Sequence, residues 1–418
     1  MNKKMSLSYW LWIEPYVHVS IKKNRALLYN TLSGKKLEFG HRSIIRMIKA
    51  MMKKENLLVI EVRKKEFEKP CINEFIAAIK DHFMGDLADV NASVAKPIQL
   101  MPMISNHADV RRAKKSIYKP GKSIMTYLYE LTIYINGGAG VNHDNIYKQF
   151  LFPRPGTEGR TKELAVHRID PLLTELKGSG LYSLNVIGGN ILVYSEFEKL
   201  LTCLESYPLL KTFHIYYTDA ADYLDRVHRI NGEKAKIEFS VTFPVNLKKF
   251  ETIVHYIKAK ENMSVLFAIA NENELETCEQ LISRYNPVNF QIKPYYNGTN
   301  IDFFRNVVYI DSDHIRESTP SQKEIFQRMA MNSNDFGKLT IMTNGDIYAN
   351  LNHPRLGNIN KNSISDVIYK ELFKGKSWLS IRGQKRPCNG CLYNVLCPPL
   401  SNYEYVIGGN NLCHQVQK

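Results

Sequence analysis

The first part of the chain alternates short apolar runs with polar turns and then changes to helical spacing. Runs of β-branched and aromatic residues bounded by turns favour strands, and apolar stripes at three- and four-residue spacing favour helices. The predicted strands cover residues 16–21, 26–30, 36–39 and 57–62, and the predicted helices cover residues 42–53 and 72–83. This order predicts a winged-helix-like α+β domain over residues 1–95, followed by a linker over residues 96–125.

From about residue 126 the pattern becomes a repeated strand and helix. The six predicted strands cover residues 127–135, 181–187, 212–217, 237–243, 264–270 and 290–296. Regular alternation of this kind predicts a parallel sheet with right-handed crossovers, either open or closed into a complete or partial barrel. Function in such folds lies at the carboxyl ends of the strands. There the sequence has a glycine-rich loop at 136–162 and the turn Gly188-Gly189-Asn190.

Ser195 and Glu198 have the spacing of a capping box. In this motif a serine at the helix N-terminus and a glutamate three residues later satisfy each other's backbone N–H groups. The pair predicts that a helix over residues 196–206 begins at Ser195.

After residue 297 the alternation stops. Residues 298–336 have the pattern of an irregular insertion. Asn344-Gly345 stands between two apolar runs and predicts a hairpin over residues 338–350, because this dipeptide suits a tight two-residue turn. A helix is expected over residues 364–374.

Four of the seven cysteines lie in the last thirty-one residues, at Cys388, Cys391, Cys397 and Cys413. A CxxC loop can turn both thiolates toward one centre, and two further cysteines complete a tetrahedral set of soft ligands. Four thiolates suit zinc or an iron–sulfur cluster, and the spacing alone does not choose between them. Two disulfides, or a redox-active CxxC motif, are the alternatives.

Composition describes an ordinary globular protein, with 44% hydrophobic and 23% charged residues among 418. No apolar run is long enough to span a membrane, and the start of the chain has no signal-peptide core. The other cysteines, Cys71, Cys203 and Cys278, are scattered among apolar residues and are expected to be reduced. We therefore expect a cytoplasmic protein.

The net charge of +15 is unevenly distributed. Residues 1–120 carry 23 Lys and Arg against 11 Asp and Glu, a difference of +12, so the other 298 residues carry only +3. A basic first domain suits an acidic peptide or nucleic acid, and a solvated basic surface is the third interpretation.

The order of motifs in the second part of the chain resembles radical S-adenosylmethionine (radical SAM) proteins that carry a SPASM domain. The strand that ends in Gly188-Gly189-Asn190 is similar to the family's second strand. The segments 345–350 and 356–359 are similar to the SPASM hairpin and to the Leu-Gly-Asn-Ile segment that follows it. The resemblance covers residues 126–418. It implies a partial (β/α)6 barrel over 126–297, and an insertion plus a SPASM-like domain over 298–418.

Departures from the family pattern remove its catalytic cluster. Radical SAM chemistry requires three cysteines, spaced CxxxCxxC, in the loop after the first strand, but no cysteine occurs between residues 72 and 202. Asn190 also replaces the glutamate of the family's Gly-Gly-Glu turn, which leaves Gly188, Gly189 and Asn190 as a vestigial cofactor site. The resemblance therefore implies that S-adenosylmethionine is not cleaved and that the chain has no catalytic residues of this type.

The SPASM pattern is altered selectively. Asn350 and Ser401 stand where the family has cysteines that ligate the inner auxiliary cluster. All four cysteines of the outer site are present. The resemblance thus implies one auxiliary [4Fe–4S] cluster held by Cys388, Cys391, Cys397 and Cys413, with zinc as the other possible occupant.

The N-terminal domain resembles the PqqD-like elements that recognise the leader of a precursor peptide. Such elements add the leader as a strand beside their third strand, against the last helix. The residues expected to line that groove are Lys36, Leu37, Phe39, Phe75, Ala78 and Ile79. A basic domain suits an acidic leader.

The predicted function is that of a pseudo-radical-SAM accessory protein of the kind found in Bacteroidales-type peptide-maturation systems. Its partners would be the precursor peptide and an active radical SAM enzyme.

Two alternatives remain. The strand ends could support an enzyme of another class, with polar residues at His143, Asp144, Asn190, Asp219 and Lys293. The basic domain could bind nucleic acid, although the helix at 72–83 offers only Lys80 as a cation.

Overall fold

The computed structural model describes residues 8–90, 95–97, 121–137, 146–153, 162–258, 260–287, 289–409 and 411–414. Its largest sheet has nine strands in the order β12-β11-β10-β9-β8-β7-β13-β14-β15. These are β7 (Glu130–Tyr134), β8 (Ser183–Ile187), β9 (Leu210–Tyr216), β10 (Ala235–Val241), β11 (Met263–Ile269), β12 (Phe290–Pro294), β13 (Lys338–Ile341), β14 (Asp346–Tyr348) and β15 (Gly357–Asn358).

The six strands β7 to β12 are parallel and lie in sequence order, which confirms the predicted parallel sheet. The predicted hairpin is also present, as β13 and β14. Strand β13 pairs in parallel with β7, so the hairpin extends the sheet rather than standing apart from it. The last two strands, β14 and β15, are antiparallel to their neighbours.

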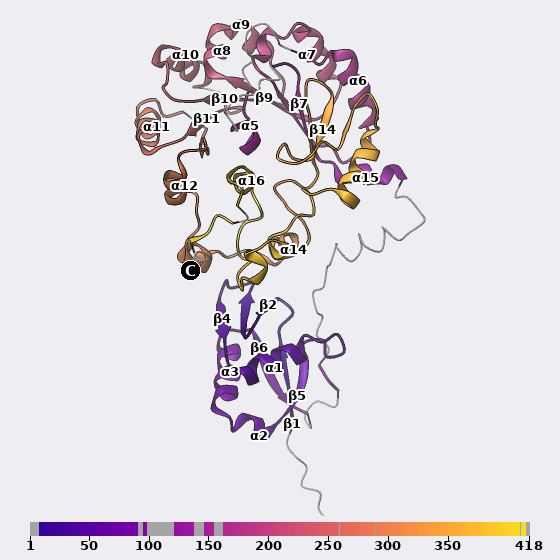
Figure 1. Cartoon of the computed structure of the whole chain (residues 1–418), viewed down its shortest axis with the longest axis vertical. Helices are drawn as coiled ribbons and strands as arrows, with labels where there is room; N and C mark the ends of the chain where they lie inside the picture. The colour runs from indigo at the N-terminus through magenta and orange to yellow at the C-terminus, as the bar shows by residue number, and fades with distance from the viewer. Residues whose placement is uncertain are drawn as a thin grey trace, which may run out of the picture.

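Helices lie on both sides of this sheet (Figure 1). Alternate strand residues such as Leu131, Ile133 and Leu184 pack into the main core, which spans residues from Ile124 to Trp378. The helices outside the arc of strands are α6 (Val166–Glu175), α7 (Phe197–Glu205), α8 (Tyr217–Asp222), α9 (Leu224–Arg229), α10 (Leu247–Ile257) and α11 (Glu272–Tyr285). The short helices α5 (Ile146–Gln149) and α16 (Asn402–Ile407) lie on the inner side.

The N-terminal part has its own core, built from residues between Leu11 and Met84. Two three-stranded antiparallel sheets surround it, in the orders β5-β1-β6 and β2-β3-β4. Its elements are β1 (Ser8–Ile13), β2 (Val17–Lys22), β3 (Arg25–Asn30), β4 (Lys36–Phe39), α1 (Arg42–Met51), β5 (Val59–Arg63), α2 (Lys64–Phe67), α3 (Pro70–Asp81) and β6 (Gly85–Asp89). Strands β1 and β6 were not predicted from the sequence.

Strand β6 forms because of its partner rather than its own composition. It carries two aspartates, which are rare in strands, yet it pairs along its whole length with β1. Gly85 allows this close approach, since a Cβ there would lie 2.2 Å from the carbonyl oxygen of Trp12. Pairing across seventy residues overrides local propensity here.

Residues 298–336 are not irregular, and that prediction was wrong. The segment contains α12 (Ile301–Val307), α13 (Ser312–Glu317) and α14 (Gln322–Ala330). Two of these helices begin at side-chain caps: Asp311 accepts hydrogen bonds from the first turn of α13, and Ser321 forms a capping box with Glu324. The helices are short, so their caps were a better signal than their apolar periodicity.

The capping box predicted at Ser195 and Glu198 is also wrong. Helix α7 begins one residue later, with Glu196 at the N-cap position and no side-chain cap. The Ser195 hydroxyl instead donates to the carboxylate of Glu163, and Glu196 accepts from the N–H of Val166. Both side chains therefore hold the segment before α6, and neither caps α7.

The C-terminal segment connects the two cores. It contains α15 (Ile364–Lys374), which was predicted, and the 3-10 turns η3 (Arg382–Gln384) and η4 (Cys388–Gly390). Two further 3-10 turns lie in the large domain: η1 (Gly121–Tyr127) precedes β7, and η2 (Ile191–Val193) follows β8. Figure 1 shows the N-terminal domain next to α14 and the yellow C-terminal chain. No helix among the described residues combines the length and apolar character needed to cross a bilayer.

Candidate functional site

The four C-terminal cysteines lie in one region, mostly buried beneath the N-terminal domain. All are thiols; Cys388, Cys397 and Cys413 are buried and Cys391 is half-buried. Cys413 is brought back to this region by a short parallel bridge to Ile310. Burial raises the pKa of Cys397 to about 12, and the charges of the other three cysteines act on it in the same direction. The four sulfurs thus share one electrostatic environment.

Three cations face this group of cysteines. The Arg382 guanidinium lies 4.0 Å from the sulfur of Cys388. The charge of Arg328 interacts with Cys397, and the charge of Lys22, from β2, acts on Cys391. Four thiolates around a divalent ion or a cluster carry net negative charge, so cations at these positions would compensate it.

The chemistry of this set fits a metal centre, but its sulfurs are not closed around an ion. In the part of the chain that the structure describes, no three His, Cys, Asp or Glu side chains are arranged to hold a metal. Such sites are seldom preformed, because binding of the ion organises the ligands. Donor type, burial and compensating charge therefore fit zinc or a [4Fe–4S] cluster on Cys388, Cys391, Cys397 and Cys413, as the sequence predicts.

Asn350, at one of the two positions where the family has inner-cluster cysteines, is held by other side chains. Its amide nitrogen donates to Asp335 Oδ1 at 3.0 Å and to Asn402 Oδ1 at 2.6 Å. Asn352 in turn donates to the amide oxygen of Asn350 at 3.0 Å. This network leaves Asn350 no role as a metal ligand.

Ser401, at the second position, caps α16. Its N–H donates to Glu404 Oε2 at 2.6 Å, and the pair forms a capping box. Glu404 is fully buried and also pairs with Arg382, the cation beside Cys388. The two altered positions thus have structural roles that a cluster would disrupt.

The Gly188-Gly189-Asn190 turn is filled by Asn136, which follows β7. Asn136 donates to the carbonyl oxygen of Asn190 at 2.6 Å and accepts from the N–H of Gly189 at 3.1 Å. A Cβ at Gly188 would lie 2.2 Å from the Asn136 side-chain oxygen, which explains the glycine. The side chain of Asn190 itself accepts from the N–H of Leu192 at 3.0 Å. The turn therefore does not fit the amino and carboxylate groups of S-adenosylmethionine.

Helix α5 and the residues after it cover the inner face near the carboxyl ends of the strands. Ile146 and Phe152 pack against Leu266 and Ala268 of β11. Gln149 donates to the carbonyl oxygen of Tyr296 and accepts from its N–H, each at 2.8 Å, like an added strand residue. Side chains thus occupy part of the space where barrel proteins bind ligands. His143 and Asp144, in the preceding loop, lie outside the described residues.

Deeper on the inner face lies a polar cavity of about 480 Å³. A hydrogen-bonded chain crosses its wall: Asn185 donates to Thr132 at 3.3 Å, His214 Nε2 lies 3.4 Å from Asn185 Oδ1, and His214 Nδ1 lies 3.0 Å from Glu238 Oε1. Burial alone would raise the pKa of Glu238, but the hydrogen bond and charge of His214 and the charge of Lys293 hold it below its usual value.

Sequence reasoning missed this chain of polar residues. The signal was present, because each of four neighbouring strands carries at least one polar residue that lines the cavity. Of the strand-end residues predicted for an alternative enzyme, Lys293 lines the cavity. Asp219 does not; it lies in α8, where burial and the charge of Asp222 raise its pKa to about 6.

The residues predicted to bind a leader peptide divide into two groups. Strand β4 pairs with β3 alone in the part of the chain that is described, so one of its edges has no strand partner there. Leu37 and Phe39 on β4 are half-buried, and the Phe39 ring packs edge-on against Phe75 at 4.9 Å. Phe75 and Ile79 are fully buried and support the edge from beneath. Lys36 instead donates to the carbonyl oxygens of Arg316 and Ser318, at the end of α13 and just after it.

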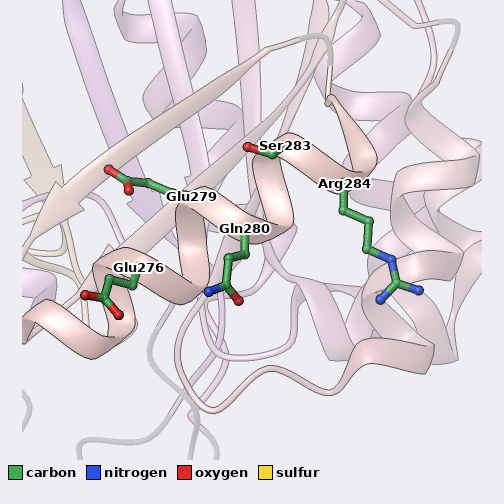
Figure 2. Close-up of a pocket in the computed structure, with 5 residues that line it drawn as sticks. All are labelled: Glu276, Glu279, Gln280, Ser283 and Arg284. Atoms are coloured by element: carbon green, nitrogen blue, oxygen red, sulfur yellow. The ribbon is translucent and has the colours of Figure 1, made fainter.

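A further depression lies along α11, away from all these residues. Figure 2 shows its lining, Glu276, Glu279, Gln280, Ser283 and Arg284, all on a single helix. Side chains from one helix surface cannot enclose a ligand, and we assign this depression no function.

Comparisons with known proteins find matches among solved structures. No family model matches the sequence, and no curated protein matches it. Three of the matching structures are of SuiB from Streptococcus suis. The structure bound to the precursor peptide SuiA is 12% identical, covers 97% of this chain and 99% of that chain, and gives a TM-score of 0.49.

The SuiB structure bound to S-adenosylmethionine is 12% identical over 97% of this chain and 99% of that chain, with a TM-score of 0.47. A third SuiB structure is 13% identical over 92% and 94%, with a TM-score of 0.45. At this identity and structural agreement, the likenesses carry no functional argument.

Proposed function

We propose that this chain is a catalytically inactive relative of radical SAM/SPASM proteins. In this proposal it binds a ribosomal precursor peptide during maturation and keeps one metal centre, a [4Fe–4S] cluster or zinc, on Cys388, Cys391, Cys397 and Cys413. One observation carries the proposal. The turn and the positions that serve cofactors in the family are filled by Asn136, Asn350 and the Ser401 cap, whereas the four outer cysteines remain together among cations.

The proposed architecture follows from the same resemblance. It comprises a peptide-recognition domain at 1–95, a linker at 96–125, a partial (β/α)6 barrel at 126–297 and a SPASM-like domain at 298–418. The sequential order of β7 to β12 supports a barrel rather than a doubly wound sheet, whose strand order reverses at a switch point.

Purified protein with S-adenosylmethionine and a strong reductant, kept free of oxygen, tests the loss of catalysis. We expect no 5′-deoxyadenosine, because the loop directly after β7 has no cysteine to hold the cluster that would cleave the sulfonium. Formation of 5′-deoxyadenosine by the protein alone would overturn the proposal.

Peptide binding would occur by strand addition at β4. An added strand gains main-chain hydrogen bonds, and the half-buried side chains of Leu37 and Phe39 would give selectivity. The +12 charge balance of residues 1–120 favours an acidic peptide. In this proposal the protein is cytoplasmic and has an active radical SAM enzyme as its partner.

A fluorescent peptide of alternating Glu and Leu residues tests the peptide site. We expect binding that weakens with added salt and is lost in Phe39→Ala, with Phe83→Ala, an exposed aromatic elsewhere in the domain, as the control. Tighter binding to duplex DNA than to peptide would favour nucleic acid instead. The pairing of Lys80 with Asp86 at 3.0 Å argues against that outcome.

The polar cavity supports a second candidate function, a small-molecule site with chemistry unrelated to radicals. Both ring nitrogens of His214 lie near oxygens, those of Glu238 and Asn185, so the buried imidazole is held beside a carboxylate. Buried pairs of this kind are common at functional sites. Native mass spectrometry tests this candidate. A small molecule that copurifies with the wild type and is absent from Glu238→Gln would favour it.

A further inference from the structure

The N-terminal domain packs directly on the segment that carries the cysteines. Side chains of β3 alternate between two cores. Ala26 and Leu28 face the domain's own core, whereas Leu27 and Tyr29 face the other way. We call the second group the docking cluster; its buried members are Leu27, Tyr29, Ile315, Ile325, Leu392, Leu396, Cys397 and Cys413. Two of the four proposed metal ligands are therefore part of the interface with the N-terminal domain.

A continuous path of hydrogen bonds leads from the cysteines to β4. The carbonyl oxygen of Leu396, the residue before Cys397, accepts from Ser318 Oγ at 3.1 Å. The carbonyl oxygen of Ser318 accepts from Lys36 Nζ at 2.8 Å, and that of Arg316 accepts from the same ammonium at 2.6 Å. Lys36 is the first residue of β4, the proposed peptide edge.

Two further contacts fix the start of β4 to the same loop. Tyr29 donates to the carbonyl oxygen of Pro320 at 2.8 Å. Gly34 lies against Thr319, where a Cβ would be 2.6 Å from the Thr319 methyl group. Residues 316–320 thus connect the cysteine segment to the turn before β4 and to its first residue.

The cysteine segment has little regular structure of its own. Between Cys388 and Cys397 the only element is the 3-10 turn η4, Cys388–Gly390. Its backbone hydrogen bonds are local turns, such as those from the N–H of Cys391 to Cys388 and from the N–H of Leu396 to Tyr393, so an ion bound by the four cysteines would organise the rest of the loop. The side chains of Leu392 and Leu396, which receive β3, lie within the same loop.

We propose that metal bound to the four cysteines controls how firmly the N-terminal domain is docked and how well β4 is ordered for peptide. This inference rests on the proposed metal centre. Loss of the metal loosens the loop, exposes the docking cluster and releases residues 316–320 from Lys36. Because coupling between two sites is reciprocal, a weakened docking contact also weakens metal retention.

Hydrogen–deuterium exchange on the full chain tests the coupling in one direction. Wild type and Cys391→Ser are purified without oxygen, and the metal content of each sample is measured first. We expect the variant to lose its metal and to exchange about tenfold faster over residues 25–39 and 312–330. The strands β7 to β12 should exchange at the same rate in both.

The metal measurement separates the two ways in which the idea can fail. A wild type without metal overturns both the proposed centre and the coupling. If the wild type holds metal and the variant does not, but both exchange at the same rate, only the coupling is overturned.

A pair of neighbouring lysines tests the reverse direction. Lys36→Met removes the ammonium that bridges Arg316 and Ser318, whereas Lys35→Met alters an exposed side chain next to it. Lys35 is exposed and Lys36 is half-buried, and neither belongs to a hydrophobic core, so both variants should keep the fold. We expect faster metal release to a chromogenic chelator, by roughly five- to tenfold, from Lys36→Met and an unchanged rate from Lys35→Met. Equal release from both variants and wild type would overturn the proposal.

Discussion

At the scale of single residues, amide side chains stand at positions where the radical SAM/SPASM proteins that this sequence resembles hold cofactors. An asparagine offers both a donor and an acceptor in a small volume, so it can satisfy a buried turn or carboxylate without a metal. Asn136 does this for the Gly188-Gly189-Asn190 turn, and Asn350 does it for Asp335. Asn350 was visible in the sequence as a departure from a motif, whereas Asn136 was not. The hydrogen-bond partners of both were hidden, because each comes from a distant element.

The carboxyl of Asp335, which accepts from Asn350, has a strongly shifted pKa. Burial raises its pKa to about 7, although the amide of Asn350 acts in the opposite direction. A carboxyl with a raised folded-state pKa binds more protons when folded, so stability falls as pH rises between about 4 and 7. We expect Asp335→Asn to remove a decrease of up to about 4 kcal/mol over that range.

Urea unfolding of the wild type and Asp335→Asn at several pH values measures this effect. The difference between their free energies of unfolding should change steadily from pH 4 to 7 and then level off. A difference independent of pH would show that Asp335 is already ionised in the folded protein across this range.

At the scale of elements, the sequence predicted the helices and strands that are determined by a local pattern of apolar and polar residues. The strands β7 to β12 are short apolar runs between polar segments, and α15 has the predicted bounds. Strand β6 was missed because its aspartates disfavour a strand, and only the pairing with β1 stabilises one there. Helix α5 was missed because a helix of four residues is too short to show an apolar periodicity. Its position is fixed by Gln149 and by packing on β11.

Gln149 should therefore hold α5 on the inner face. We expect Gln149→Ala to raise hydrogen exchange at Tyr296 and through α5, because the two hydrogen bonds to the Tyr296 backbone are lost. Stability should fall by about 1–3 kcal/mol. Gln280→Ala, on the exposed surface of α11, is the control (Figure 2). Unchanged exchange at Tyr296 would mean that packing of Ile146 and Phe152 alone places α5.

At the scale of the whole molecule, the three largest clusters of buried side chains among the described residues organise the chain. One lies within the N-terminal domain, one beneath the large sheet, and the docking cluster joins them. The sequence indicated the first two, since each follows local periodicity. It could not indicate the third, because β3 reads as a uniformly apolar strand. Only the fold shows that Leu27 and Leu28 serve different cores.

Leu28→Ala tests the independence of the N-terminal core. Loss of a fully buried leucine costs about 2–5 kcal/mol. We expect that cost to appear as faster exchange in β1, β2 and β3, with β7 to β12 unaffected. Equal acceleration in both regions would show that the two cores unfold as one unit.

We propose that one metal centre remains in this chain, on Cys388, Cys391, Cys397 and Cys413, while side chains fill the other positions that hold cofactors in radical SAM/SPASM proteins. Iron, sulfide and zinc are measured in protein purified without oxygen, with Cys391→Ser beside it. We expect about four iron and four sulfide per chain, or one zinc without sulfide, and loss of either in the variant. About eight iron would reveal a second cluster, and protein with neither iron nor zinc would leave the four cysteines without their proposed role; either result would overturn the proposal.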